Sequence, residues 1–412
     1  MNLLYNLLLF KVSIILPIIA LFNKKIRLFV NGRKETFSKL DSITPSDKVL
    51  WFHAASLGEF EQGRPIIEDL KKQYIDHKIV VTFFSPSGYE IRKNYKLADV
   101  ICYLPLDTKA NVRKFINKIH PDIAIIIKYE FWPNLLSELK KQNIHTILIS
   151  GIFRKKQSFF KWYGKFTRSK LKAFDHFFVQ NEISKKLLSS INFENTTIAG
   201  DTRFDRVYDI LKQDNSLDFI SQFKNNSYTI VAGSTWKEDE KLLVNYINNV
   251  ASNDEKFIIA PHNINEKQIL ELQKSIHKKT ALYSKKDGLN LSEYQVFIID
   301  TIGLLTKIYS YADVAYVGGG LATGLHNILE PATFKIPIVF GGNKYKKFKE
   351  ATDLIDLKSV TIVTNNEKFS SIFTVLKNDK NLREQMGETN HNYIKDNIGA
   401  TKAILNYIKT VI

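Results

Sequence analysis

The chain is poor in cysteine, and that scarcity excludes one class of protein. A single cysteine, Cys102, among 412 residues leaves no partner for an internal disulfide, which fits a reducing compartment. Ten prolines and eighteen glycines leave little room for long disordered tracts. Apolar residues make up 44% of the chain and charged residues 25%, which are globular values, and the length suffices for two domains.

Acidic residues are also scarce relative to basic ones. The chain has 42 Asp and Glu against 59 Lys and Arg, a formal net charge of +17. Such an excess attracts polyanions: nucleic acid, an anionic bilayer or a phosphorylated substrate. The lysines are spread over helical segments, and the sequence has neither a zinc-ligand spacing nor an aromatic-interleaved RNA-binding signature. We therefore expect no nucleic-acid partner, with a merely solubilising surface as the alternative.

Long apolar runs are missing except near the N-terminus. Residues 3–22 are nearly all apolar and are about long enough to cross a hydrocarbon core of ~30 Å. Five basic residues follow within 24–34, which marks the cytoplasmic side of a membrane. Since no small-x-small cleavage site follows, we expect an anchor rather than a removable signal. We favour a helix that spans the membrane, since one central lysine costs only a few kcal/mol. Lys11 supports the alternative, a helix lying in the interface, and both readings stay open.

From residue 48 onward, apolar runs alternate with amphipathic stretches, a pattern typical of a parallel sheet covered by helices on both faces. The alternation pauses over the polar residues 205–226 and then resumes, which predicts two α/β domains of Rossmann-like, doubly wound type facing across a cleft. The expected strands are 49–54, 79–84, 100–104, 123–127, 146–149, 176–179, 196–199, 228–232, 256–260, 296–300, 314–317 and 336–340.

Four segments are expected in all. They are an anchor with its basic flank (1–35), an acceptor-binding domain (36–210), a nucleotide-binding domain (211–385) and a C-terminal helix that could pack back on the first domain (386–412).

The segment Gly318–Glu330 carries the clearest ligand-binding pattern. Three glycines follow an apolar run and precede a polar loop and a new helix, which together make a phosphate cradle. Asn327 can add an amide donor, and Glu330 can accept from ribose hydroxyls. The pattern indicates a nucleotide or nucleotide-sugar, and a glycine turn that binds nothing is the alternative.

A second pattern follows the first expected strand, where Ser56, Gly58 and Glu59 lead into a helix. Glu59 would stand in the first helical turn, where the helix dipole keeps a carboxylate ionised. An ionised carboxylate facing a ligand can take a proton from an attacking hydroxyl. The alternative is structural, because Glu is favoured in a first turn for electrostatic reasons alone.

Taken in order, nine segments resemble the Kdo (3-deoxy-D-manno-octulosonic acid) transferases of lipopolysaccharide synthesis. They are WFHAASLGEFEQGRPII (51–67), TFFSPSGYE (82–90), YLPLDT (103–108), YEFWPNLL (129–136), AGDTRFDRV (199–207), AGST (232–235), DTIG (300–303), ADVAYVGGGL (312–321) and HNILEPATFKIPIVFG (326–341). The resemblance implies an inverting GT-B glycosyltransferase without metal or cofactor. Its donor would be CMP-Kdo and its acceptor the phosphorylated lipid A precursor (lipid IVA), at the cytoplasmic face of the bacterial inner membrane.

The resemblance also implies roles for particular residues, with Glu59 as the general base. The implied donor-binding residues are Ser234, Thr235, Pro261, His262, Gly318, Gly319, Gly320, Asn327 and Glu330. The candidates for binding the acceptor or the Kdo group are Ser56, Gly58, Arg64, Ser85, Ser87, Lys128, Glu130 and Arg203.

The chain departs from the family pattern at three places. His262 stands where many relatives have Arg, Lys128 stands where relatives often have Glu, and Leu325 precedes His326 where Gly is common. Three other functions compete with Kdo transfer. One is a different GT-B enzyme, such as a lipid-linked N-acetylglucosaminyltransferase or a UDP-sugar 2-epimerase. The others are a basic nucleic-acid-binding protein and a non-catalytic sugar-nucleotide sensor.

Overall fold

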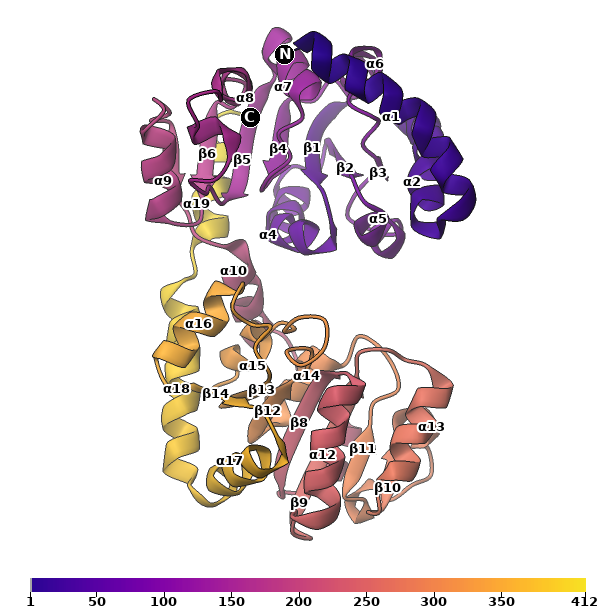
Figure 1. The fold of residues 1–412 in the computed structure, drawn as a ribbon, viewed down its shortest axis with the longest axis vertical. Helices are drawn as coiled ribbons and strands as arrows, with labels where there is room; N and C mark the ends of the chain where they lie inside the picture. Colours follow the sequence, from indigo (N-terminus) through magenta and orange to yellow (C-terminus); the bar gives the residue numbers. More distant parts are fainter. Residues whose placement is uncertain (1) are drawn as a thin grey trace. The chain divides into compact units, whose positions relative to one another are not determined.

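The computed structural model describes residues 2–412 and divides the chain into two compact units, each built on one parallel sheet (Figure 1). Unit 1 contains the chain up to Asp205 together with Ile398–Ile412, and unit 2 contains Arg206–Asn397. The two doubly wound α/β folds predicted from the alternation are confirmed.

The sheet of unit 1 has seven strands in the order β3-β2-β1-β4-β5-β6-β7, all paired in parallel. The strands are β1 (Lys48–Ala54), β2 (His77–Phe83), β3 (Val100–Tyr103), β4 (Ile123–Ile127), β5 (His145–Gly151), β6 (His176–Val179) and β7 (Thr196–Ile198). The chain enters at β1, winds outward to β3, and then returns to β4 on the other side of β1. This change of direction makes the carboxyl ends of β1 and β4 the place where such sheets bind ligands.

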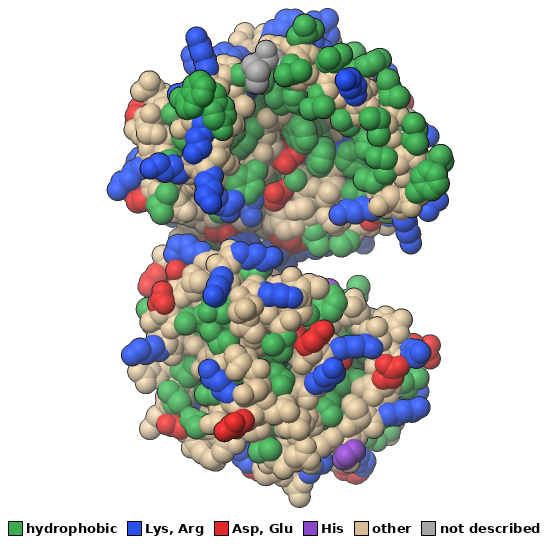
Figure 2. Space-filling model, viewed as in Figure 1, with side chains coloured by type: hydrophobic (Ala, Val, Ile, Leu, Met, Phe, Trp, Pro, Cys, Tyr) green, Lys and Arg blue, Asp and Glu red, His purple; other side chains and the backbone are tan. Residues whose placement is uncertain are grey.

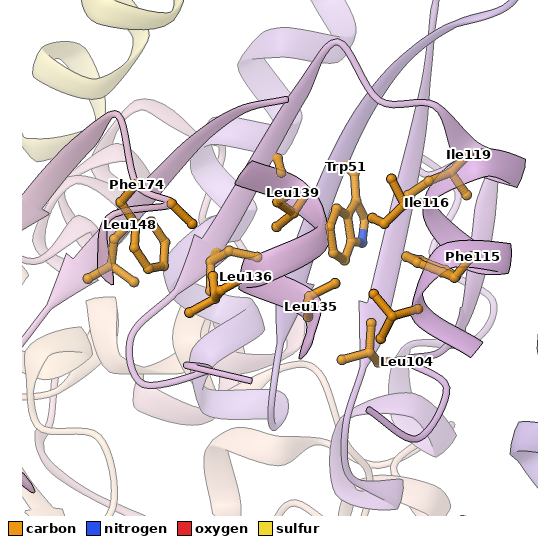
Figure 3. Close-up of a cluster of buried hydrophobic side chains, with 14 of the residues drawn as sticks. Trp51, Leu104, Phe115, Ile116, Ile119, Leu135, Leu136, Leu139, Leu148 and Phe174 are labelled. Atoms are coloured by element: carbon orange, nitrogen blue, oxygen red, sulfur yellow. The ribbon is translucent and has the colours of Figure 1, made fainter. Parts of the chain in front are cut away.

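Helices cover both faces of this sheet. They are α4 (Leu57–Gln73), α5 (Pro86–Arg92), α6 (Lys109–Ile119), α7 (Pro133–Lys141), α8 (Lys165–Leu171), α9 (Glu182–Ser189) and α19 (Ala400–Ile408), with a 3-10 turn η2 at Ser158–Phe160. Alternate residues of β1 point to opposite layers, as strand geometry requires. Trp51 packs with α6 and α7 on one side, where its ring meets Phe115 edge-on at 5.2 Å (Figure 3), and Phe52 joins α4 and α19 on the other.

The C-terminal helix α19 is held in unit 1 by Asp205. The carboxylate of Asp205 accepts hydrogen bonds from the backbone N–H groups of Gly399 (2.6 Å) and Thr401 (2.9 Å). The buried side chains of Ile404 and Ile408 then extend the core beneath α4.

The N-terminal helix α1 (Asn2–Phe22) is long and apolar enough to cross a membrane by length and composition. It is followed by α2 (Lys24–Lys34), α3 (Thr36–Lys39) and a 3-10 turn η1 (Leu40–Ser42). Tyr5 donates a hydrogen bond to Asp107 (2.7 Å), and Asn6 accepts one from Asn134 (2.8 Å). The helix therefore contacts unit 1 near its start, while most of its leucine and isoleucine side chains stay exposed (Figure 2).

Unit 2 repeats the architecture of unit 1 with the order β10-β11-β9-β8-β12-β13-β14. Its strands are β8 (Tyr228–Thr235), β9 (Glu255–Pro261), β10 (Thr280–Leu282), β11 (Val296–Ile298), β12 (Val314–Val317), β13 (Ile338–Gly341) and β14 (Val360–Val363). The winding changes direction between β8 and β12, which pair in parallel from Ile230 to Gly233. The sequence pattern missed the edge strands β10 and β14, which are three and four residues long.

The helices of unit 2 are α11 (Asp218–Lys224), α12 (Lys237–Asn249), α13 (Glu266–Ser275), α14 (Leu305–Ile308), α15 (Leu329–Thr333), α16 (Lys349–Asp356), α17 (Asn366–Asn378) and α18 (Lys380–Asp396). Short 3-10 turns are η3 (Ile210–Lys212), η4 (Tyr283–Lys285), η5 (Leu291–Glu293) and η6 (Tyr309–Tyr311), and α10 (Thr202–Asp209) joins the units. Tyr246 of α12 packs with Phe369 and Phe373 of α17 against one sheet face, and Phe223 of α11 covers the other.

Candidate active site

In unit 1, the predicted base lies in the turn that joins β1 to α4. Oε2 of Glu59 accepts hydrogen bonds from the backbone N–H groups of Ala55 (2.6 Å) and Ser56 (3.2 Å). These bonds hold a half-buried carboxylate at the carboxyl end of β1, next to β4. The side chain thus closes the turn and is also placed at the position where a doubly wound sheet binds its ligand.

A second carboxylate, Glu130, lies in the loop after β4 and is tied to a buried histidine. Its Oε2 lies 3.0 Å from Nε2 of His53 and accepts a hydrogen bond from Nε1 of Trp132 at 2.7 Å. The other ring nitrogen of His53 lies 2.9 Å from the hydroxyl of Thr82 on β2. His53 and Thr82 are completely buried, so Glu130 is anchored by the interior of the sheet.

The two carboxylates have opposite electrostatic environments. Burial raises the pKa of Glu59 above its ordinary value, and the negative charge of Glu130 acts in the same direction. The pKa is raised because burial and the charge of Glu130 outweigh the opposing bond from Ala55 and the charge of Lys128. Burial also acts to raise the pKa of Glu130, but the bonds from His53 and Trp132 outweigh it and leave that pKa lowered. Of the two carboxylates, Glu59 is therefore the one whose pKa is raised and Glu130 the one whose pKa is lowered.

Lys128 and Arg203 lie in the same region of unit 1. Lys128 follows β4 with a left-handed backbone (φ 64°), which is costly for a lysine. Its charge opposes the rise in the pKa of Glu59 and, after Arg203, contributes to the lowered pKa of Asp201. Arg203 contacts the buried Asp201 through Nε (2.9 Å) and Nη2 (2.8 Å). Asp201 also accepts a bond from Gln62 of α4 (3.0 Å), so the arginine is fixed to the helix that carries Glu59.

Three other candidates of unit 1 have mainly internal partners. Arg64 donates to Glu68 (2.6 Å) one turn along α4, which uses its guanidinium in a surface ion pair. The hydroxyls of Ser85, the N-cap of α5, and Ser87, in its first turn, are 2.7 Å apart. The backbone N–H of Ser85 donates to Ala55 (2.9 Å), so the start of α5 packs against the turn of Glu59.

In unit 2, the loop after β8 meets the loop after β12 through a buried aspartate, Asp239. Its carboxylate accepts hydrogen bonds from the N–H groups of Trp236 (2.9 Å) and Gly319 (2.9 Å) and from the hydroxyl of Tyr316 (2.7 Å). Ser234, next to the last residue of β8, has a left-handed backbone with φ 53°. Asp239 therefore fixes the position of the glycine loop relative to the first turn of α12 (Lys237–Asn249).

The three glycines of this loop are required by contacts within the protein. A Cβ on Gly318 would lie 2.4 Å from the carbonyl oxygen of Ser234, and one on Gly320 would lie 2.1 Å from that of Gly341. Gly319 adopts φ +92°, and its Cβ would lie 2.3 Å from the carbonyl oxygen of Gly324. The tight loop predicted from the sequence exists, but its glycines make room for neighbouring backbone.

Asn327 and Glu330 bind each other. Nδ2 of Asn327 donates to Oε1 of Glu330 (3.0 Å), while Oδ1 accepts from the N–H of Leu329 (3.1 Å). Oε2 of Glu330 accepts from the hydroxyl of Thr306 (2.7 Å), so its carboxylate is oriented from two sides. The helix that follows, α15, spans only five residues, Leu329–Thr333.

The remaining donor candidates surround a small polar cavity and an aromatic stack. Thr235 and Pro261 help to line a cavity of about 190 Å³ beside the start of α12. The ring of His262 stacks on Trp236 at 4.8 Å, and Nε1 of Trp236 donates to Nε2 of His326 (3.0 Å). Burial, with a smaller effect of His262, lowers the pKa of His326 to about 4, so His326 stays neutral and accepts that bond at physiological pH.

The sequence interpretation missed His53, Thr82, Asp201 and Asp239. Asp239 lies three residues after Trp236, the N-cap of α12, which is the spacing of a capping box. That spacing could have identified Asp239 from the sequence. His53 and Asp201 lie inside segments already singled out, but their partners are distant in the chain. Among residues 2–412, no group of three or more His, Cys, Asp or Glu side chains is arranged to hold a metal ion.

Two doubly wound sheets, each with polar groups gathered where its winding reverses, make up the GT-B fold, and the chain has that fold. The UDP-GlcNAc 2-epimerase from Neisseria meningitidis, solved with UDP-GlcNAc, has this fold at TM-score 0.59 and 17% identity over 88% of this chain and 100% of its own.

The family model of 3-deoxy-D-manno-octulosonic-acid transferase (kdotransferase) matches residues 31–206. The 3-deoxy-D-manno-octulosonic acid transferase of Haemophilus influenzae is 25% identical over 89% of this chain and 87% of its own length. A bifunctional glycosyltransferase/methyltransferase of Fusobacterium nucleatum is 27% identical over 94% of this chain, which spans 61% of that relative. The matched domain and the curated relatives identify the protein as a glycosyltransferase that is similar to Kdo transferases over most of its length.

Proposed function

We propose that this enzyme transfers Kdo from CMP-Kdo to the phosphorylated lipid A precursor (lipid IVA) with inversion at the sugar carbon. The observation that carries the proposal is the half-buried carboxylate of Glu59, which has a raised pKa and stands at the switch point of the unit 1 sheet. A sugar hydroxyl has a pKa far above 7 and needs a base as it attacks. The acceptor oxygen forms the new bond to Kdo, its proton passes to Glu59, and CMP leaves with the electron pair.

Unit 2 is proposed to hold the nucleotide. Thr235 ends β8 and the loop Gly318–Gly320 follows β12, the two strands at its switch point. Asp239 connects the two loops through the N–H groups of Trp236 and Gly319. Oriented donors in place before the reaction stabilise charge that develops on a leaving phosphate. Glu330, already aligned by Asn327 and Thr306, is proposed to accept from the ribose hydroxyls of CMP.

We further propose that the enzyme works on the cytoplasmic face of the inner membrane, with α1 lying in the interface. The exposed leucines and isoleucines of α1 would enter the lipid, while Tyr5 and Asn6 keep the helix against unit 1. The charge of +17 suits both the anionic leaflet and a phosphorylated acceptor.

The proposal is tested by incubating the purified protein with CMP-Kdo and lipid IVA and measuring the mass of the product by mass spectrometry. A lipid heavier by one or more Kdo residues supports it, and an unchanged lipid with intact CMP-Kdo contradicts it. The same assay with UDP-GlcNAc tests 2-epimerisation, a reaction suggested by the shared fold with the Neisseria enzyme.

Alanine at Gly58 is expected to lower transfer at least about tenfold while leaving the protein folded. No atom of residues 2–412 outside its own helical turn lies within 4 Å of a Cβ built on Gly58, so the fold leaves this space open beside Glu59. The added methyl should stabilise the helix by roughly 0.5 to 1 kcal/mol but displace a substrate that must sit against the base.

The matched variant is Gly319→Ala, in the crowded left-handed position, which should instead lower the melting temperature. Full activity of Gly58→Ala would show that the space beside Glu59 is not used by a substrate.

Replacing Glu130 with glutamine is expected to move the acid limb of the pH–rate profile to lower pH. The base must be ionised to act, so activity is lost as pH falls through the pKa of Glu59. The negative charge of Glu130 raises that pKa, and its removal therefore lowers it. The measurement is kcat/KM for transfer against pH in both proteins. An acid limb that stays in place would mean that Glu59 is not the titrating base.

A further inference from the structure

The segment between β5 and β6 has a composition unlike the rest of unit 1. Residues 154–172 contain eight basic residues and not one Asp or Glu. The basic residues are Arg154, Lys155, Lys156, Lys161, Lys165, Arg168, Lys170 and Lys172. The structure folds this segment into η2 (Ser158–Phe160) and α8 (Lys165–Leu171). Because cations crowd one surface, the segment attracts anionic partners.

Two aromatic side chains project from the middle of this basic segment. Trp162 is 91% exposed and Tyr163 is 59% exposed, and their rings meet edge to face at 5.6 Å. The neighbouring rings of Phe153, Phe159 and Phe174 are buried in the core, whereas those of Trp162 and Tyr163 remain exposed to solvent. An exposed tryptophan among lysines is the pattern of side chains that sit at headgroup level in a bilayer.

The segment is connected to α1 through one intervening helix, α7. Lys170 of α8 donates to the hydroxyl of Ser137 on α7 (2.8 Å). One turn earlier on α7, Asn134 donates to Asn6 of α1 (2.8 Å). Figure 1 shows α1, α7 and α8 along one edge of unit 1, and Figure 2 shows apolar side chains over α1 and again, flanked by Lys and Arg, over the region of α8.

We propose that residues 154–172 form a second membrane-contact element, in which Trp162 and Tyr163 enter the headgroup region of an anionic bilayer and the lysines bind its phosphates. Two contacts on one edge would fix the orientation of unit 1 on the membrane. With α1 as the single contact, unit 1 would be free to rotate about that helix. The inner side of the segment lines a cavity of about 360 Å³ together with Tyr129, Glu130 and Trp132. The element is therefore continuous with the loop that carries Glu130. The inference deepens the membrane part of the proposed function and does not depend on Kdo transfer itself.

The test uses the fluorescence of the full chain reconstituted in nanodiscs of phosphatidylcholine and phosphatidylglycerol with brominated acyl chains. Bromine quenches tryptophans that enter the bilayer. Trp51 is fully buried, while Trp132 and Trp236 are bonded inside the protein to Glu130 and His326. We expect quenching in the native protein and its loss in Trp162→Phe, while the matched change Trp236→Phe retains it. Equal quenching in the native protein and Trp162→Phe would overturn the proposal.

A charge variant tests the anionic partner. Lys155, Lys156 and Lys165 are exposed, and their joint replacement by alanine should reduce the quenching of Trp162 in anionic nanodiscs at least about twofold. The matched control replaces Lys267, Lys274 and Lys285, which are exposed in unit 2, and should change nothing.

The alternative is that residues 154–172 bind the phosphorylated acceptor rather than the membrane. A kinetic measurement distinguishes these two hypotheses. If the three lysine changes leave quenching intact but raise KM for the bis-phosphorylated acceptor in detergent, the segment binds substrate and the proposal is wrong. Quenching measured in Glu59→Gln separates the two hypotheses, because membrane contact should survive there even if transfer is lost.

Discussion

Glutamine at Glu59 is expected to reduce kcat for Kdo transfer by about 100- to 10,000-fold, the range usually lost with a general base. The acceptor hydroxyl would then have to lose its proton to water as the new bond forms. Glutamine keeps an oxygen that can accept from Ala55 and Ser56, so the turn between β1 and α4 should survive. Alanine would remove that bond as well, and its effect would combine chemistry with a lost cap worth about 1 kcal/mol.

The measurement is the rate of product formation by mass spectrometry, with CMP binding followed by calorimetry. Glu68→Gln is the matched control, since Glu68 lies on the same helix, where it forms a partly exposed ion pair with Arg64 and accepts a long hydrogen bond from Tyr95 (3.4 Å). Native turnover in Glu59→Gln would remove the base from the mechanism. Loss of CMP binding together with turnover would mean that the variant had disturbed more than proton transfer.

Alanine at Asp239 is expected to destabilise unit 2 by about 3 to 5 kcal/mol and to weaken CMP binding. The change leaves three donors without their acceptor, namely the N–H groups of Trp236 and Gly319 and the hydroxyl of Tyr316. Tyr316 and Gly319 are buried, so water cannot readily replace the lost carboxylate. The glycine loop would lose the hydrogen bond from Gly319 to Asp239 and become less ordered. A nucleotide would then bind more weakly, because its binding energy would have to order the loop.

Thermal unfolding should register this change as a fall in melting temperature of roughly 10 °C, given the size of the unit. The neighbouring Glu238→Ala removes an exposed carboxylate from the same helical turn and should leave the melting temperature nearly unchanged. If Asp239→Ala melts like the native protein, the aspartate does not organise the two loops.

Much of the fold could be predicted from local pattern. The long central strands, such as β4 (Ile123–Ile127), are continuous apolar runs because both faces of a parallel sheet are buried. The edge strand β10 (Thr280–Leu282) escaped prediction because three residues carry too little pattern to stand out. Its existence depends on the neighbour β11, with which it pairs.

The sequence predicted which acidic residues belong to the candidate site, but it did not predict how their pKa values differ. Glu59 and Glu130 are both visible as acidic residues after apolar runs, yet nothing local separates their pKa values. Only the fold brings His53 against Glu130, from 77 residues away, and so leaves Glu59 as the carboxylate with the raised pKa. The dipole argument considered only one helix, and burial acts on the pKa of Glu59 in the opposite direction.

The amino-acid sequence by itself determined which segments become strands and helices, and that polar residues follow the strands, because these properties repeat over a few neighbouring residues. The fold alone decided that Gly318 and Gly320 make room for the backbone of Ser234 and Gly341. It also decided that the pKa of Glu59 is raised while that of Glu130 is lowered. Both outcomes depend on distances between atoms far apart in the chain, and free energies of burial and charge follow those distances rather than the order of residues.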